Sequence, residues 1–170
     1  VSIVMAVHNQ AELTLECLRS LAKNAGPDVE VIILDNASSD QTEDILRRID
    51  GALVIRADEN LHFLRGINRA AKHARGAYIL LLNNDTTVLP GAIDAAAARL
   101  DAESDLGAVG GPILQLDGTL QEAGCIIWKN GHTEPYGQGA DPNAPEFQFR
   151  RDVDDCSGAF LMVRHDLWES

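Results

Sequence analysis

Residues 78–85 read Tyr78-Ile79-Leu80-Leu81-Leu82-Asn83-Asn84-Asp85, an apolar run that ends abruptly in two amides and a carboxylate. A short continuous apolar run is typical of a strand that is covered on both faces of a parallel sheet. Ligands of open α/β sheets lie at the carboxyl ends of the strands, so we expect this polar end to face a crevice. Its oxygens suit a hard divalent cation. A plain polar turn before Pro90 would give the same local pattern.

Three further apolar runs precede this one, and each also ends in polar residues. They cover residues 2–7, 29–34 and 52–55, and they are followed by His8-Asn9, Asp35-Asn36 and Asp58-Glu59-Asn60. Segments with the helical spacing of apolar residues lie between and after the runs, at 11–25, 40–49, 63–74 and 93–100. Alternating strands and helices predict a mostly parallel, right-handed sheet flanked by helices. The four polar clusters should therefore meet at one edge of that sheet.

Local signals also predict how three of these helices begin or end. Asp40 and Glu43 have the spacing of a capping box at the second helix. Gly76 is expected to end the helix over 63–74, and Pro90 is expected in the first turn of the helix that follows it.

The sequence changes character after Asp105. Short strands are expected over 106–112 and 113–116, with Asp117-Gly118 as a hairpin turn before the next strand. Residues 131–145 are rich in Gly and Pro, which predicts an exposed, mobile loop. A polar turn after residue 153 then leads into a last buried strand. We expect a small antiparallel or mixed layer at the edge where the polar clusters lie.

Composition narrows the function classes. The chain has 170 residues, 45% hydrophobic and 24% charged, which fits one globular domain with a substantial core. No apolar run is long enough to span a bilayer, and no signal peptide is visible. The formal net charge of -12 argues against a nucleic acid as the partner, because binding to its phosphates requires a basic surface.

Three cysteines, Cys17, Cys125 and Cys156, are too few and too widely spaced for a disulfide framework or a zinc site. We expect ordinary buried thiols in a reducing compartment. Because the chain begins inside an expected strand, we also expect it to be a segment of a longer protein.

Taken in order, these motifs resemble the family 2 inverting glycosyltransferases, which have the GT-A fold, and within them the rhamnosyltransferase-like branch. The resemblance covers nearly the whole chain. His62 departs from the pattern, because many relatives have a glycine at this position. The segments that carry the resemblance are residues 1–9, Asp35-Asn36-Ala37-Ser38-Ser39-Asp40, Glu59-Asn60-Leu61-His62-Phe63 with Gly66 and Asn68, Leu82-Asn83-Asn84-Asp85-Thr86, Asp117-Gly118, Ala123-Gly124 and Ser157-Gly158-Ala159.

The resemblance implies one GT-A domain, with a nucleotide-sugar-binding half over 1–105 and the start of an acceptor-side half over 106–170. It implies that the donor is a nucleoside-diphosphate sugar bound at the strand ends. Asp85, with Asn83 assisting, would bind the Mg²⁺ or Mn²⁺ that bridges the donor's diphosphate. The other donor contacts that it implies are Ala6, Val7 and His8 along the base, Asp35 and Asn36 on the base or ribose, and Asn60, Arg65, Asn68 and Asn84.

A solvated helix face is the alternative explanation for the basic helix that carries Arg65, Asn68, Arg69 and Lys72. The implied reaction is attack by an acceptor hydroxyl on the anomeric carbon, with inversion, and it needs a carboxylate as general base. In relatives this base lies some tens of residues after the segment that corresponds to Ser157-Gly158-Ala159. We therefore expect the base beyond Ser170, and donor binding with weak or absent transfer by this chain alone.

Asp154 and Asp155 are weaker candidates for a role beside the acceptor, and a solvated turn would explain them as well. The acceptor is expected to be a glycan or a lipid-linked glycan in polysaccharide synthesis. We expect a cytoplasmic location, at the inner face of the membrane if regions outside this chain associate with it.

Two other functions stay open on the sequence alone. A nucleotidyltransferase also joins a βαβ sheet to metal-binding carboxylates. It usually has a glycine-rich, basic loop after the first strand, and Val7-His8-Asn9-Gln10-Ala11-Glu12 offers none. The second is a non-catalytic sugar-nucleotide-binding or scaffold domain.

Overall fold

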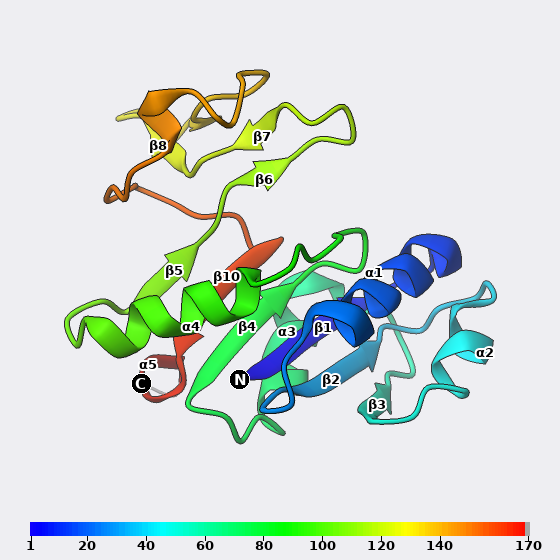
Figure 1. Cartoon of the computed structure of the whole chain (residues 1–170). Helices are drawn as coiled ribbons and strands as arrows, with labels where there is room; N and C mark the ends of the chain where they lie inside the picture. The colour runs from blue at the N-terminus through cyan, green and yellow to red at the C-terminus, as the bar shows by residue number, and fades with distance from the viewer. Residues whose placement is uncertain (169–170) are drawn as a thin grey trace.

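Six strands form the central sheet of the computed structural model, which describes residues 1–168. The strand order is β3-β2-β1-β4-β10-β5 (Figure 1). The first four strands are parallel, and β10 is antiparallel to both of its neighbours. The predicted α/β fold with a mostly parallel sheet is confirmed. The strands are β1 (Ser2–Val7), β2 (Glu30–Asp35), β3 (Ala52–Arg56), β4 (Tyr78–Leu82), β5 (Ala108–Gly110) and β10 (Phe160–Arg164).

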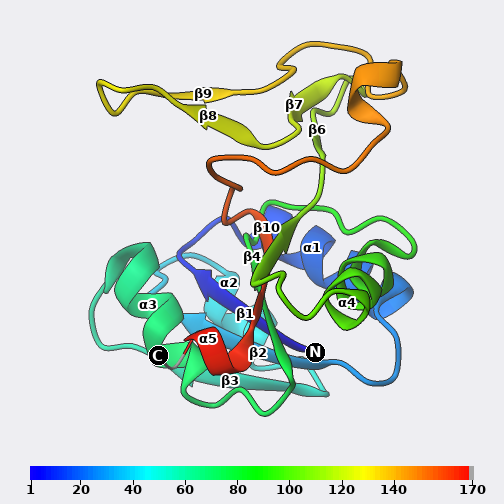
Figure 2. The same ribbon diagram turned by 90° about the vertical axis from the view of Figure 1, so that its left-hand side faces the viewer.

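Helices cover both faces of this sheet, as Figure 2 shows for α3 on one side and α1 and α4 on the other. Successive strand residues point to opposite faces, so each strand supplies two cores. On β1, Ile3 and Met5 pack with α1, α2 and α4, whereas Val4 packs with α3. The helices are α1 (Ala11–Asn24), α2 (Thr42–Leu46), α3 (His62–Ala71), α4 (Ala92–Ala102) and α5 (His165–Trp168). No helix among residues 1–168 combines the length and the apolar character that crossing a membrane requires.

The parallel register brings the strand ends together as expected. Val7 lies opposite Asp35, and Asp35 lies opposite Arg56. On the other side of β1, Val4 lies opposite Leu81 of β4. The polar residues that follow β1, β2, β3 and β4 therefore share one edge of the sheet.

Two of the predicted helix starts are wrong. The second helix begins at Thr42, and its N-cap residue Gln41 makes no side-chain cap. Asp40 instead accepts the backbone N–H groups of Thr42 (2.9 Å) and Ala11 (3.1 Å), so it joins two loops. Pro90 lies outside α4, because Gly91 with φ 76° is the N-cap.

The predicted end of the third helix is also wrong. α3 ends at Ala71, five residues before Gly76. A Cβ atom on Gly76 would lie 2.9 Å from both the backbone nitrogen and the hydroxyl oxygen of Ser2. Gly76 is therefore required by close packing against the start of β1.

An antiparallel layer follows β5 and lies beyond the carboxyl ends of the parallel strands (Figures 1 and 2). The turn at Asp117-Gly118 is confirmed, since Leu114 pairs with Leu120 across it. The expected loop over 131–145 is wrong in part, because residues 133–135 form a strand that pairs with β8. The elements are β6 (Ile113–Leu114), β7 (Leu120–Glu122), β8 (Cys125–Ile127), β9 (Thr133–Pro135) and the 3₁₀ helix η1 (Pro145–Phe147).

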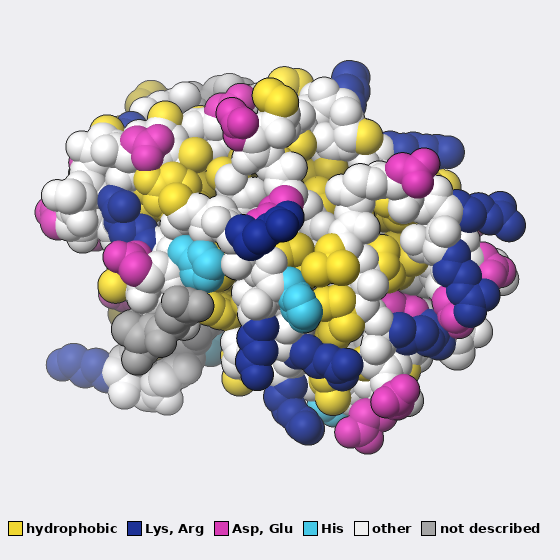
Figure 3. All heavy atoms as spheres, turned by 90° about the horizontal axis from the view of Figure 1, so that it is seen from below, with side chains coloured by type: hydrophobic (Ala, Val, Ile, Leu, Met, Phe, Trp, Pro, Cys, Tyr) yellow, Lys and Arg dark blue, Asp and Glu magenta, His cyan; other side chains and the backbone are white. Residues whose placement is uncertain are grey.

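The face of the molecule opposite this layer carries charges of both signs. Lys and Arg side chains gather in two places on it, and Asp or Glu side chains lie beside each group (Figure 3). This face therefore offers no continuous basic surface of the kind that nucleic-acid binding requires.

Candidate functional site

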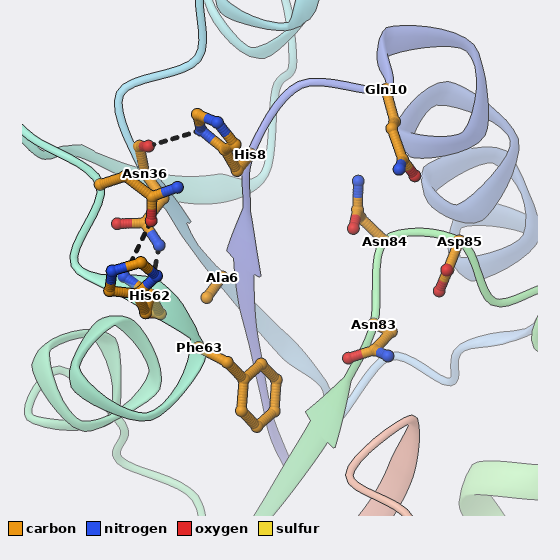
Figure 4. Close-up of a pocket in the computed structure, with 10 residues that line it drawn as sticks. Ala6, His8, Gln10, Asn36, His62, Phe63, Asn83, Asn84 and Asp85 are labelled. Atoms are coloured by element: carbon orange, nitrogen blue, oxygen red, sulfur yellow. Dashed lines mark hydrogen bonds between the residues drawn. The ribbon is translucent and has the colours of Figure 1, made fainter.

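A pocket of about 300 Å³ opens at the carboxyl edge of the sheet, beside the ends of β1 and β4 (Figure 4). The chain passes from β1 to β2 on one side and returns to β4 on the other, so this is the topological switch point where α/β sheets bind ligands. The volume lies at the lower end of the range for small-molecule sites. The lining residues are Ala6, His8, Gln10, Asn36, Asn60, His62, Phe63, Asn83, Asn84 and Asp85.

Most of the residues expected at the donor line this pocket, and four do not. Val7 is buried in the sheet, and the Asp35 residue is only 1% exposed. Arg65 and Asn68 are exposed on α3 and are not among the lining residues. Gln10, His62 and Phe63 also line the pocket, although they are not among the predicted donor contacts.

Hydrogen bonds hold the loops after β1 and β2 against each other. The Asn9 backbone N–H donates to Ser38 Oγ (2.9 Å), and Asn9 Oδ1 accepts the Ser39 N–H (2.8 Å). Asp40 completes the contact through the N–H of Ala11, as described above. These polar residues position one another and so hold the two loops that carry the lining residues His8, Gln10 and Asn36.

Asn36 links the end of β2 to the start of α3. Its Oδ1 accepts the Leu61 N–H (2.8 Å), and its Nδ2 donates to the His62 carbonyl oxygen (3.2 Å). Its own carbonyl oxygen lies 2.8 Å from His8 Nδ1. A carbonyl oxygen only accepts, so His8 Nδ1 carries the proton in this contact. Both amide atoms of Asn36 are thus engaged within the protein.

Asp35 has a similar supporting position. Its carboxylate forms an ion pair with Arg56 and accepts the Ser38 N–H (2.9 Å). Arg56 also donates to the Ser38 carbonyl oxygen (3.0 Å) and pairs with Glu43 (3.1 Å). The predicted contact of Asp35 with base or ribose stays a prediction, and the structure shows Asp35 ordering the loop that carries Asn36.

The turn after β4 presents Asp85 to the pocket. Asn84 Nδ2 donates to Thr14 Oγ1 (2.8 Å), which ties the turn to α1. The Cys17 thiol donates to the Asn83 carbonyl oxygen (3.5 Å), and burial raises the pKa of this thiol to about 12, so it stays protonated. The Asp85 side chain is exposed and has no hydrogen-bond partner within residues 1–168.

Four residues other than glycine have a positive φ in the described chain, and all lie at this edge. They are Asn9 (59°), Gln10 (62°), Ala37 (58°) and His62 (58°). A left-handed backbone is unfavourable for residues with a Cβ atom, and such strain is concentrated at functional sites. His62, which departs from the glycine of many relatives, keeps the conformation that glycine adopts most easily.

We expect His62→Gly to be more stable than His62→Ala by about 0.5 to 1 kcal/mol. Both variants lose the imidazole, so the comparison isolates the free-energy cost of a Cβ atom on a residue with φ 58°. The greater entropy of glycine in the unfolded chain offsets part of this difference. Urea unfolding of the two variants measures the difference. Equal stabilities, or a more stable alanine variant, would show that residue 62 is not left-handed in solution.

The residues present fit a divalent metal that is shared with a ligand. No group of three or more His, Cys, Asp or Glu side chains in residues 1–168 could hold a metal ion alone. Among the described residues, Asp85 is the only carboxylate that lines the pocket, and the Asn83 amide lies beside it (Figure 4). Mg²⁺ sites commonly use one or two carboxylates and complete the shell with water and substrate phosphate.

Asp154 and Asp155, the candidates near the acceptor, do not line this pocket. Asp154 Oδ2 accepts the Ile127 N–H (3.0 Å), and the backbone of Asp155 pairs with Cys125. Both side chains are exposed on the segment that returns from the antiparallel layer to β10. These contacts support the alternative of a structural turn.

The mostly parallel sheet and the pocket at its switch point are those of the GT-A fold, which solved glycosyltransferase structures share. The chain belongs to glycosyl transferase family 2, whose family model matches residues 2–168.

Three relatives illustrate the similarity. Over its full length the chain is 32% identical to the O-antigen biosynthesis protein RfbC of Myxococcus xanthus, and it spans 14% of that protein. Among solved structures it is similar to TarS 1-349 of S. aureus in complex with UDP-GlcNAc, with 26% identity and a TM-score of 0.60 over 67% of this chain and 34% of that one. It also resembles the mannosyltransferase PcManGT of Pyrobaculum calidifontis in complex with GDP-Man and Mn²⁺, with 24% identity and a TM-score of 0.61 over 67% of this chain and 35% of that one.

Proposed function

We propose that this domain binds a nucleoside-diphosphate sugar in the pocket and that the protein containing it transfers the sugar to an acceptor hydroxyl with inversion. The observation that carries the proposal is Asp85, an exposed carboxylate with no hydrogen-bond partner among residues 1–168, in a pocket at the switch point of a family 2 chain. The similarity to TarS, solved with UDP-GlcNAc, supports a nucleotide sugar as the donor.

The pocket residues suit the neutral parts of such a donor. Amide and imidazole groups line most of it, and they can donate and accept hydrogen bonds with hydroxyl groups. No Lys or Arg is among the lining residues, so the diphosphate charge has to be met in another way. Asp85, with the Asn83 amide oxygen, would hold Mg²⁺ or Mn²⁺, which when bound acts as a Lewis acid and stabilises the departing diphosphate.

In the proposed reaction an acceptor oxygen forms a bond to the anomeric carbon while the bond from that carbon to the diphosphate oxygen breaks. The hydroxyl proton passes to a carboxylate base, which we place outside residues 1–168 because Asp154 and Asp155 do not line the pocket. Similarity to the O-antigen biosynthesis protein RfbC supports a glycan or lipid-linked acceptor in polysaccharide synthesis. We also propose a cytoplasmic location, which suits the three free thiols.

Calorimetric titration with UDP, GDP and dTDP, each with Mn²⁺ and with EDTA, tests this proposal. We expect one nucleotide to bind in the micromolar range with Mn²⁺ and much more weakly with EDTA, because the pocket itself supplies no cation. Circular dichroism provides the control that the chain is folded. A folded chain that binds none of the three would contradict the donor site and favour a scaffold role.

A further inference from the structure

Phe63 is an unusual wall residue for this pocket. It is the second residue of α3, and it is 44% exposed. Apart from the small Ala6, every other residue that lines the pocket is polar. Figure 4 shows the ring extending from the start of α3 toward β4, below Ala6 at the edge of the pocket. An aromatic ring left open among amides is a binding surface for a ligand with an apolar face.

The ring rests on a turn that the antiparallel layer holds in place. A Cβ atom on Gly158 would lie 3.2 Å from Cζ and 3.4 Å from Cε1 of Phe63. The turn around Gly158 is fixed on both sides, since buried Glu122 accepts the Ser157 N–H (3.1 Å) and the Ala159 carbonyl oxygen accepts the Asn83 N–H (3.2 Å). The outer edge of the ring is thereby packed against Gly158, and the 44% exposure of Phe63 leaves ring surface available to a ligand.

The chemistry around the ring favours a sugar over the other parts of a nucleotide sugar. A pyranose has an apolar C–H face and a rim of hydroxyl groups, and Phe63 with the adjacent Asn83 amide matches both. The diphosphate is expected beside Asp85, because no Lys or Arg among the described residues lines the pocket and the proposed metal would meet its charge there. The base is expected at the other wall, near Ala6 and His8, where the β1 and β2 loops meet.

We propose that the Phe63 ring stacks on the C–H face of the donor's sugar and is a specificity-determining residue for that sugar. This inference rests on the proposed function, because it takes the pocket as a donor site. Gly158 supports this position of the ring, since a Cβ atom there would make a tight contact of 3.2 Å with Cζ and displace the ring by a few tenths of an ångström.

The test compares nucleotides with and without the sugar in Phe63→Ala and Phe63→Leu. The pairs are UDP with UDP-GlcNAc, GDP with GDP-mannose and dTDP with dTDP-rhamnose, and the pair used is the one that the unsubstituted chain binds. We expect Phe63→Ala to weaken binding of the nucleotide sugar on the order of fivefold while the nucleoside diphosphate binds as before. Phe63→Leu should lose part of this effect, because it keeps apolar volume without the ring.

Leu64→Ala is the matched control, since Leu64 follows on the same helix turn, is 67% exposed and does not line the pocket. Gly158→Ala should cause a smaller loss with the same selectivity, because the added Cβ atom would displace the ring by a few tenths of an ångström. Equal weakening of both ligands by Phe63→Ala would overturn the proposal in favour of base stacking or a structural role, and no change would overturn it outright. If the unsubstituted chain binds no nucleotide, the proposed function itself fails, and the stacking fails with it.

Discussion

Asp85→Ala should remove the Mn²⁺-dependent part of nucleoside diphosphate binding, a loss of at least about a hundredfold in affinity. Within the part of the chain that the structure describes, Asp85 is the only carboxylate that lines the pocket, so its removal leaves the metal without a charged ligand from these residues. A metal that neutralises the diphosphate is worth several kcal/mol, and about 2.7 kcal/mol corresponds to a hundredfold. The side chain makes no hydrogen bond in residues 1–168, so folding should be unaffected. Calorimetry with and without Mn²⁺ measures the loss.

Asp50→Ala provides the control for this experiment. Asp50 is also exposed, but it precedes β3 and so lies at the opposite edge of the sheet. Its replacement changes the net charge equally and should leave binding unchanged. Asp85→Asn keeps the shape of the side chain and should lose nearly as much affinity as alanine, because the charge is what holds the ion. Metal-dependent binding that survives in Asp85→Ala would place the ion elsewhere.

The sequence predicted which strand ends form the site, because this depends only on the direction of the strands. Apolar runs such as Leu80-Leu81-Leu82 fit a sheet covered on both faces, and parallel strands bring their polar ends to one edge. This reasoning placed His8, Asn36 and Asn83 in one pocket without any knowledge of their contacts. This reasoning needs only the order of strands and helices, which the spacing of apolar residues predicts well.

The hydrogen-bond partners of individual side chains could not be predicted from the sequence in the same way. Asp40 has a partner 29 residues away in Ala11, and this tertiary contact replaced the local capping box with Glu43. Asn36 lines the pocket as expected, yet both of its amide atoms bind backbone groups of the α3 loop. The sequence shows which groups are polar, whereas their partners depend on the register between distant loops.

Short elements were the other source of error. β9 has three residues, one of them Pro135, and its composition resembles that of a loop. It forms because Cys125, Ile126 and Ile127 offer a paired edge, which is a long-range condition. Phe63 was overlooked for a related reason, since an aromatic residue near the start of a helix is ordinarily part of the core. In the structure its ring instead packs at the pocket against the turn at Gly158, 95 positions further along the sequence.

Arg56→Leu should lower the free energy of unfolding by about 2 to 3 kcal/mol. The Asp35 side chain is only 2% exposed, and loss of Arg56 leaves its carboxylate buried without a cation. Breaking a buried pair in this way costs about 3–5 kcal/mol, and the 41% exposure of the Arg56 side chain reduces the figure because water screens the pair. Urea unfolding measures the change. Nucleotide binding should weaken as well, because the loop that Asp35 and Arg56 hold carries Asn36 into the pocket.

Arg47→Leu is the matched control for this change. Arg47 also pairs with Glu43, but its side chain is 70% exposed, so the variant should lose less than about 0.5 kcal/mol. The double variant Asp35→Asn/Arg56→Leu should recover part of the lost free energy of unfolding. Burying an uncharged amide costs less free energy than burying a lone carboxylate. If Arg56→Leu is no less stable than Arg47→Leu, Asp35 does not depend on its cation. The loop after β2 would then owe its shape to its hydrogen bonds, among them those of Ser38 and Asn36.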